Sequence, residues 1–198
     1  MASEISVDTI STTAGGTNVP NLGGGQVMEV VAGICDGETI NVTSGSYTLQ
    51  NVTADFSLTD SYQDLTGSVL TYTPPAGATR VIYEFNWQSK TPSTRTLYHV
   101  KLMIAGTTVN LSKISIGDGS SVTGVVQNYH TYRRIIPIGG TASTDTGRQS
   151  SWASGKELKL QVRRYSSSYT ATMHTTNHTD GGGSDSLVNP SLSITAIR

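Results

Sequence analysis

The chain has 198 residues, a length that fits one domain with an extension, and only 14% of them are charged, against about 25% in typical soluble domains. Its formal net charge of −1 provides no field that would gather nucleic acid or an anionic membrane, and no apolar run reaches the length of a membrane span. Nucleic acid binding and membrane insertion are therefore excluded. The 21 glycines and the abundant Ser and Thr favour a turn-rich β protein, and no stretch has the apolar stripe of a long helix.

The first 25 residues are expected to form an extended N-terminal arm. Ile5, Val7 and Ile10 stand among polar residues in a short strand pattern, and glycines at 15–16 and 23–25 interrupt any continuation. Such a strand has main-chain groups to pair, and no hairpin turn follows closely enough to supply a partner. We predict that residues 1–25 are a docking arm with a glycine hinge, and that residues 26–198 form the body.

The first half of the body reads as short strands separated by turn residues. We expect strands over 26–34, 39–43, 47–58 and 65–73, the last one ended by Pro74 and Pro75. The clearest pattern is 80–88, where Val81, Tyr83, Phe85 and Trp87 alternate with polar residues. This segment is predicted to be a central strand.

The second half continues in the same way. Residues 98–104 and 108–111 predict a hairpin, and 122–138 is long enough for one bent strand or two. The amphipathic segment 157–163 is expected to pair with 169–174, and a closing strand follows Pro190. Together these segments predict an all-β protein with a jelly-roll-like β-sandwich body.

The residues give little sign of catalysis or of a cofactor. Cys35 lies in an apolar run and is expected to be a small buried side chain. His174 and His178 would be about 13 Å apart along a strand, too far to share a metal ion within one chain, although a site built by several chains stays open. The acidic residues are dispersed, largely in turns, and no nucleophile elbow or phosphate loop occurs. We expect no enzyme activity, no cofactor and no metal.

One cluster has the composition of a recognition surface. Tyr129, His130, Tyr132 and Arg133 combine aromatic rings, which stack on sugars, with a guanidinium that binds anions. The same residue types are enriched in subunit interfaces. Both a glycan-binding surface and a subunit interface are kept as readings of this cluster, and the interface is favoured.

Several stretches of the sequence resemble one group of viral proteins. They are Ser3-Glu4-Ile5-Ser6-Val7-Asp8-Thr9-Ile10, the run from Gly67 to Thr79 continuing into 81–85, the run from Gly147 to Lys156, and the ending 192–197. These stretches are similar to tail-fibre-like and other virion appendage proteins of marine bacteriophages, and the similarity covers nearly the whole chain. It implies a non-enzymatic virion component, usually a homotrimeric β-rich head with its N-terminus toward the particle.

The resemblance and the arm together give the functional hypothesis. The protein is expected to be a tail-fibre or capsid-fibre type appendage, made in the host cytoplasm and located in the virion. Its partners would be two further copies of itself, other virion proteins bound through Ile5, Val7 and Ile10, and a glycan of the host surface. The alternatives are a capsid decoration or cement protein and a carbohydrate-binding module.

Overall fold

Strands make up nearly all of the regular structure in the computed structural model, which describes residues 25–91, 95–117, 124–177 and 183–198. One short 3-10 helix, η1, covers Asn110–Ser112. The strands are β1 Val27–Ile34, β2 Thr39–Val42, β3 Gly45–Thr48, β4 Phe56–Ser57, β5 Gln63–Asp64, β6 Leu70–Tyr72, β7 Arg80–Thr91, β8 Tyr98–Ile104, β9 Thr107–Thr108, β10 Ile114–Ile116, β11 Val126–Pro137, β12 Lys156–Arg164, β13 Thr172–Met173, β14 Thr175–Thr176, β15 Ser186–Leu187 and β16 Ser191–Ile197. The prediction of an all-β protein is confirmed.

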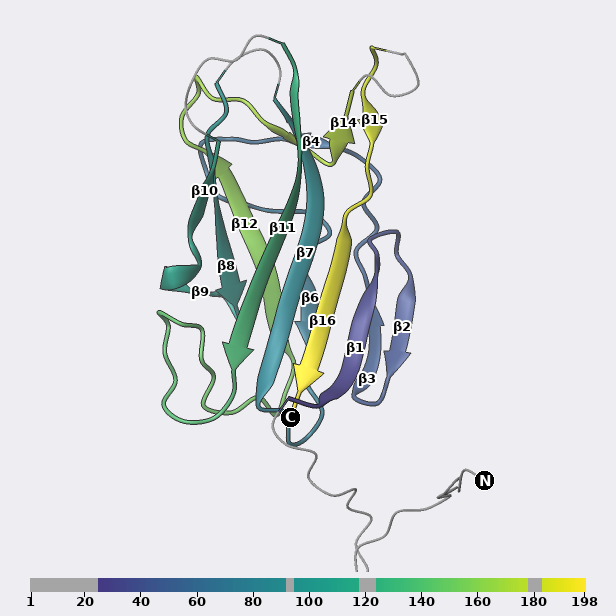
Figure 1. The fold of residues 1–198 in the computed structure, drawn as a ribbon, viewed down its shortest axis with the longest axis vertical. Helices are drawn as coiled ribbons and strands as arrows, with labels where there is room; N and C mark the ends of the chain where they lie inside the picture. The colour runs from purple at the N-terminus through teal and green to yellow at the C-terminus, as the bar shows by residue number, and fades with distance from the viewer. Residues whose placement is uncertain (1–24, 92–94, 118–123, 178–182) are drawn as a thin grey trace, which may run out of the picture.

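Two six-stranded sheets form the sandwich (Figure 1). The first sheet has the order β1-β16-β7-β13-β4, with β11 also paired to β7. The second sheet has the order β10-β8-β12-β5, with β6 paired to β12 and β9 to β8. All pairs between these strands are antiparallel. The β2–β3 hairpin and the β14–β15 pair complete the strand pairing in the described part of the chain.

Strand β7 is the centre of the first sheet, as its alternating pattern predicts. It pairs along its whole length with β11 on one side, and with β16 and then β13 on the other. Its odd-numbered side chains, among them Val81, Tyr83, Phe85 and Trp87, are at most 2% exposed. A strand with this strict alternation has one face in the core, because successive side chains point to opposite faces of the sheet.

The core lies between the inner faces of the two sheets. From the first sheet it receives the alternating side chains of β7 and β16, and from the second those of β8 and β12. Fully buried members include Trp87, Tyr98, Leu102, Leu160 and Ile194. Removing one such aliphatic side chain from water stabilises the fold by about 1.5–3 kcal/mol.

Two strand predictions are corrected by the structure. The segment 169–174 does not pair with 157–163, because β12 already has β8 on one edge and β5 and β6 on the other. Residues Thr172–Met173 instead cross to the first sheet and pair with β4 and β7. The long strands expected over 47–58 and 65–73 are also shorter, since only β3, β4 and β6 form within and beside them.

Both ends of the described body meet at one end of the sandwich, which we call the arm end (Figure 1). The main-chain N–H of Gly25 donates a hydrogen bond of 2.8 Å to the carbonyl of Arg198, and the N–H of Arg198 donates one of 2.9 Å to the carbonyl of Gln26. The predicted docking residues Ile5, Val7 and Ile10 lie outside the described residues, so their role stays a prediction. Within the described residues, no helix is long and apolar enough to cross a membrane.

Candidate functional site

The predicted recognition cluster lies on β11, and the strand divides it between two faces. Because side chains alternate along a strand, Tyr129 and Arg133 point to the outer face of the first sheet, while His130 and Tyr132 point into the sandwich. The structure therefore brings the four residues together as two pairs on opposite sides of β11. Of the four residues, only Tyr129 and Arg133 lie on the outer face of the sheet, and we call them the outer pair.

His130 belongs to an aromatic cluster of the core. Its ring lies 5.0 Å from the Trp87 ring and 6.0 Å from the Tyr98 ring, and its Nε2 is 2.8 Å from Oγ of Ser89. Burial lowers the pKa of His130 from 6.5 to about 4, because a charged imidazolium loses its hydration there. The side chain is therefore neutral at pH 7, and its ring is half-buried and packed against the aromatic residues of the core.

Tyr132 is a second packed residue, only 5% exposed. Its hydroxyl donates a hydrogen bond of 3.2 Å to the carbonyl of Ser112, at the end of η1. Burial raises the pKa of Tyr132 above its usual value. The contact ties the edge strand β11 of the first sheet to the η1 segment that follows the β8–β9 hairpin of the second.

The outer pair is accessible and spaced along the strand. The Tyr129 side chain is 65% exposed, and Nε of Arg133 lies 3.5 Å from a carboxylate oxygen of Glu84 on the neighbouring strand. Four residues of strand separate Tyr129 from Arg133 by about 13 Å. A recognition role for these two side chains stays a prediction, with Tyr129 as the exposed aromatic ring.

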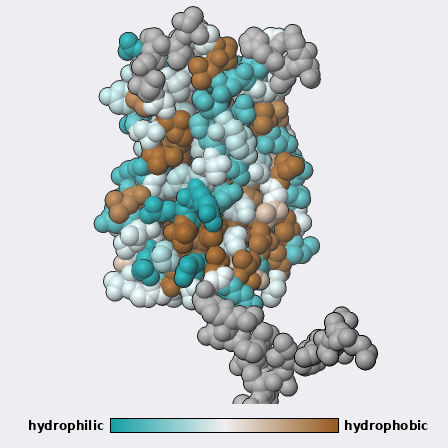
Figure 2. All heavy atoms as spheres, in the orientation of Figure 1, coloured by the Kyte–Doolittle hydropathy of each residue, from teal (hydrophilic) through white to brown (hydrophobic). Residues whose placement is uncertain are grey.

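An apolar patch covers the outer face of the first sheet near the arm end. Two rows of cross-strand neighbours form it. In the first row Val30 pairs with Thr195, Thr195 with Ile82, and Ile82 with Ile135. The neighbouring row runs across Ile197 and Arg80. The patch consists of Val27, Val30, Ile82, Ile135, Pro137 and Ile197. Val27, Val30 and Ile135 are 53%, 44% and 50% exposed. Figure 2 shows apolar residues gathered over the lower parts of β11, β7, β16 and β1.

The rest of this outer face is mostly polar, although Ile34 of β1 is 52% exposed in the row of Ser191 and Asn86. The next row carries the pair of Arg133 and Glu84, and in the row beyond it Thr131 donates a hydrogen bond of 2.7 Å to Oδ1 of Asn86. Asn86 in turn lies 3.3 Å from the hydroxyl of Ser191. The face is therefore divided into an apolar half beside the arm root and a mostly polar half away from it, and the exposed apolar cluster is a candidate interaction surface.

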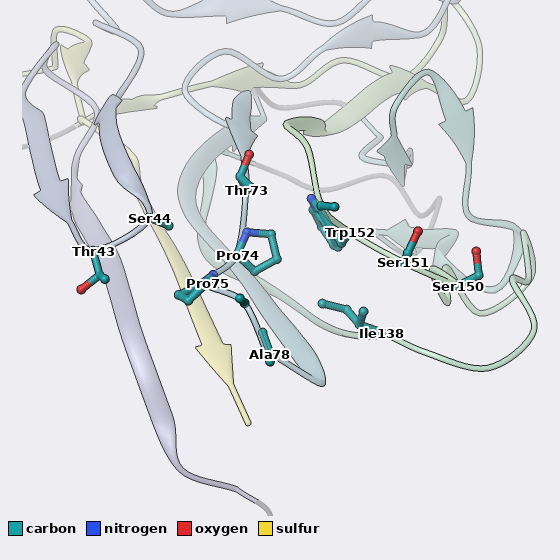
Figure 3. Close-up of a pocket in the computed structure, with 13 residues that line it drawn as sticks. Thr43, Ser44, Thr73, Pro74, Pro75, Ala78, Ile138, Ser150, Ser151 and Trp152 are labelled. Atoms are coloured by element: carbon teal, nitrogen blue, oxygen red, sulfur yellow. The ribbon is translucent and has the colours of Figure 1, made fainter. Parts of the chain in front are cut away.

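A groove of about 660 Å³ opens at the arm end. Its walls come from the β2–β3 turn, from the 73–78 loop between β6 and β7, and from residues 150–153, which precede β12. Figure 3 shows Thr43 and Ser44 on one side, Ser150, Ser151 and Trp152 on the other, and the prolines between them. None of the described residues that line the groove is charged. The volume lies within the range of about 300–1,000 Å³ typical of ligand sites.

The walls of the groove are held by hydrogen bonds from the core. The indole N–H of Trp152 donates a bond of 2.9 Å to the carbonyl of Tyr72, and the hydroxyl of Tyr47 donates one of 2.9 Å to the carbonyl of Thr73. The N–H of Ala78 donates to the carbonyl of Pro75 at 3.1 Å and closes the proline turn. The groove is therefore preformed in the folded body.

A buried carboxylate lies behind this wall. Glu29 is 8% exposed and accepts hydrogen bonds from the hydroxyl of Tyr72 at 2.7 Å, from the main-chain N–H of Ser44 at 3.0 Å, and from the hydroxyl of Ser44. The register shift of β1 between Val27 and Glu29 turns the Glu29 side chain inward while Val27 stays outward. This network fixes the β2–β3 turn against the second sheet.

The remaining chemistry-bearing residues are structural in their contacts. Cys35 is buried, as predicted, and burial raises its pKa to about 12, so the thiol is unreactive. His174 is fully buried at φ +64°, and its partner in the predicted spacing, His178, lies outside the described residues. Among the described residues, no three His, Cys, Asp or Glu side chains lie close enough together to hold a metal ion.

The sequence analysis predicted neither the patch nor the groove. One signal for the patch was available, because Ile82 is the apolar exception on the polar side of 80–88, and Ile135 and Ile136 are consecutive in a strand with one buried face. No local signal marks the groove, since its walls come from segments more than a hundred residues apart.

The fold defines the chain as an all-β sandwich protein. No protein-family model and no curated protein matches the sequence. Among solved structures, the chain is similar to that of infectious bursal disease virus Gx strain, at 12% identity and a TM-score of 0.31 over 82% of this chain and 37% of that one. It is also similar to the Gt strain structure, at 11% and 0.28 over 83% and 47%, and to the VP2 subviral particle of the same virus, at 11% and 0.28 over 81% and 46%. The chain thus spans less than half the length of each of these proteins.

Proposed function

We propose that the protein is a non-enzymatic virion structural protein, a homotrimeric tail-fibre or capsid-fibre type appendage anchored to the particle by its N-terminal arm. The observation that carries the proposal is the apolar patch beside the arm root. Side chains such as Val27, Val30 and Ile135, exposed in a single chain, are what an assembly interface buries. The three-fold order and the viral setting come from the sequence resemblance.

The division of the outer face supports an association between copies of the chain. The apolar half would be covered by neighbouring copies near the arm end, where their arms would be brought together on the particle. The polar half, with Tyr129 and Arg133, would stay on the outside. In this arrangement the body presents its other end to the surroundings, and host-surface attachment is the use we propose for it.

Sedimentation of the full chain tests the association. We expect the wild type to sediment as three copies, and the variant I135D to dissociate, because a carboxylate would be desolvated in the interface. The matched control is T131D, on the same strand and the same face but in the polar half. A wild type that sediments as a single copy at all concentrations, or an I135D variant that stays as associated as T131D, would overturn the proposed interface.

Incorporation into particles tests the anchor. Deleting residues 2–22 should leave a folded body that no longer joins the particle, since the ladders of both sheets begin only at Val27. Normal incorporation of the shortened protein would rule the docking arm out.

The alternative within the same class is a decoration or cement protein that stabilises the capsid. Particles with and without the protein separate the two functions. An attachment protein changes adsorption to the host and leaves heat and osmotic resistance unchanged, whereas a cement protein does the reverse.

A further inference from the structure

The groove at the arm end lies beside the point where the arm joins the body. Arg198 connects the two places, because its carbonyl accepts the hydrogen bond from Gly25 and a Cβ built on Gly77, in the groove wall, would lie 3.6 Å from its Nη2. The N–H of Thr79, just past the groove wall, donates a bond of 2.7 Å to the carbonyl of Ile197. Any chain leaving Gly25 therefore starts next to the groove.

The backbone at the arm root is turned. Gly25 has a φ of +122°, in the region that residues with a side chain rarely adopt, and it follows Gly23 and Gly24. This conformation changes the direction of the chain directly before β1. Three glycines in a row let the preceding residues fold back toward the groove at little steric cost.

The residues before the hinge match the groove in chemistry. The 24 residues that precede Gly25 divide into a first part containing Glu4 and Asp8 and a second part, 11–24, without a charge. The large apolar side chains of the second part are Val19, Pro20 and Leu22. An uncharged segment suits a groove without charged lining residues, because neither side has an ion to desolvate.

Individual groups of this segment also complement individual groups of the groove. Proline brings no N–H, so Pro20 leaves no donor unpaired against the apolar wall made by Pro74, Pro75 and Trp152. The side-chain amides of Asn18 and Asn21 can exchange hydrogen bonds with the hydroxyls of Ser150 and Ser151 on the rim.

Reach selects this segment over the rest of the arm. At about 3.3–3.6 Å per extended residue, Leu22 lies within about 10 Å of Gly25 and Val19 within about 20 Å, which matches a groove that borders the arm root. Tethering at this short range gives the segment a high effective concentration at the groove of its own chain.

We propose that the groove at the arm end binds the Val19–Leu22 segment of the same chain. The bound segment would act as a latch between the body and the first ten residues of the arm, fixing the direction in which they leave. The inference does not depend on what the first ten residues bind, because it concerns the uncharged stretch that follows them.

Disulfide trapping in the full chain tests the latch. The variant carrying L22C and S151C should form an intramolecular disulfide at least tenfold faster than the control carrying L22C and R80C, since Arg80 is exposed on the outer face of the first sheet and, paired with Ile197, borders the arm root without lining the groove. Cys35 can stay, because it is buried and its thiol is unreactive. Mixing isotopically light and heavy protein distinguishes a link within one chain from a link between copies. Equal rates for the two pairs, or links only between copies, would refute the latch.

Hydrogen exchange provides a test without a new bond. Replacing Val19 and Leu22 by Ser should raise the exchange rate of the amides of 151–153 at least tenfold, while replacing Ile5 and Val7 by Ser should leave it unchanged. An unchanged rate in the first variant contradicts the proposal. The second variant reports on particle docking instead, so failure of the latch and failure of the anchor are distinguishable.

Discussion

The hydroxyl of Tyr72 donates a hydrogen bond of 2.7 Å to Oε1 of Glu29, and this contact joins the two sheets of the sandwich. Glu29 lies on β1 of the first sheet and Tyr72 on β6 of the second, and Ser44 of the β2–β3 turn donates to the same carboxylate. Burial and the neighbouring carboxylate raise the pKa of Tyr72, which therefore remains a donor. The groove at the arm end is built on this network.

Removing the acceptor should destabilise the body more than removing one donor. E29A leaves the Tyr72 hydroxyl and the groups of Ser44 without their partner, and we expect a loss of about 2–4 kcal/mol in the free energy of unfolding. Y72F removes a single donor and should cost about 1 kcal/mol. Urea unfolding followed by fluorescence measures both, and equal losses in the two variants would contradict the shared-acceptor network.

The fully buried His174 and the half-buried His130 should make the body sensitive to acid. Burial lowers the pKa of both His130 and His174 from 6.5 to about 4 in the folded state. Because the folded pKa lies below the unfolded value, the unfolded chain takes up protons first, and stability present above pH 6.5 is lost as the pH falls toward 4. For the fully buried His174 a shift of this size corresponds to about 3 kcal/mol.

Unfolding by urea at pH 7.0, 5.5 and 4.5 checks this dependence. The variant H174N keeps a residue type that tolerates the positive φ of this position, and it should lose less stability between pH 7.0 and 4.5 than the wild type. H130Q should reduce the loss of unfolding free energy between pH 7.0 and 4.5 by less than H174N does, because His130 is less deeply buried. A wild-type stability that is constant over this range would show that neither imidazole is held neutral by the fold.

The alternation of apolar and polar residues predicted the long strands, which pair with long neighbours. It did not predict pairings that depend on the order of the strands in the sheets. The pattern of Val81, Tyr83, Phe85 and Trp87 identifies a core strand because half of its side chains meet the other sheet. Thr172 and Met173 carry no such information about their partner. They pair with β7 because the edges of β12 are already occupied, and this depends on the whole sheet order rather than on their own sequence.

The candidate surfaces show the same limit. Tyr129 and Tyr132 look equivalent in the sequence, yet one is 65% exposed and the other 5%, because they point to opposite faces of β11. The sequence shows that successive residues of a strand point to opposite faces, but it does not show which of the two faces packs against the core. The groove was beyond prediction, since Ser44, Pro75 and Trp152 become neighbours only after the sheets have formed.

Glycine is required at 117 by close packing. A Cβ at Gly117 would lie 2.1 Å from the carbonyl oxygen of Thr96, and the residue has a φ of +98°. G117A should therefore lower the free energy of unfolding by about 3 kcal/mol or more, combining backbone strain with a steric clash.

The matched control is G106A. Gly106 also has a positive φ, +77°, but no atom lies within 4 Å of its ideal Cβ, so only the strain of about 1–2 kcal/mol applies. Thermal unfolding of the two variants measures the difference. Comparable losses would show that the Thr96 main chain moves aside freely.

The exposed ring of Tyr129 allows the glycan hypothesis to be tested on its own. If a stacked sugar gains as much as a stacked aromatic pair, about 0.5–1.5 kcal/mol, Y129A should weaken binding to a glycan ligand by about two- to tenfold. The fold should be unaffected, because the side chain is 65% exposed on an outer face.

The matched control is Y165A, which removes another exposed tyrosine, one that packs against His99 and Tyr169 away from β11. A glycan array followed by titration of the bound sugars measures the effect, and R133Q tests the neighbouring cation in the same assay. Binding that is equal in Y129A, R133Q and the control would remove Tyr129 and Arg133 from the attachment surface.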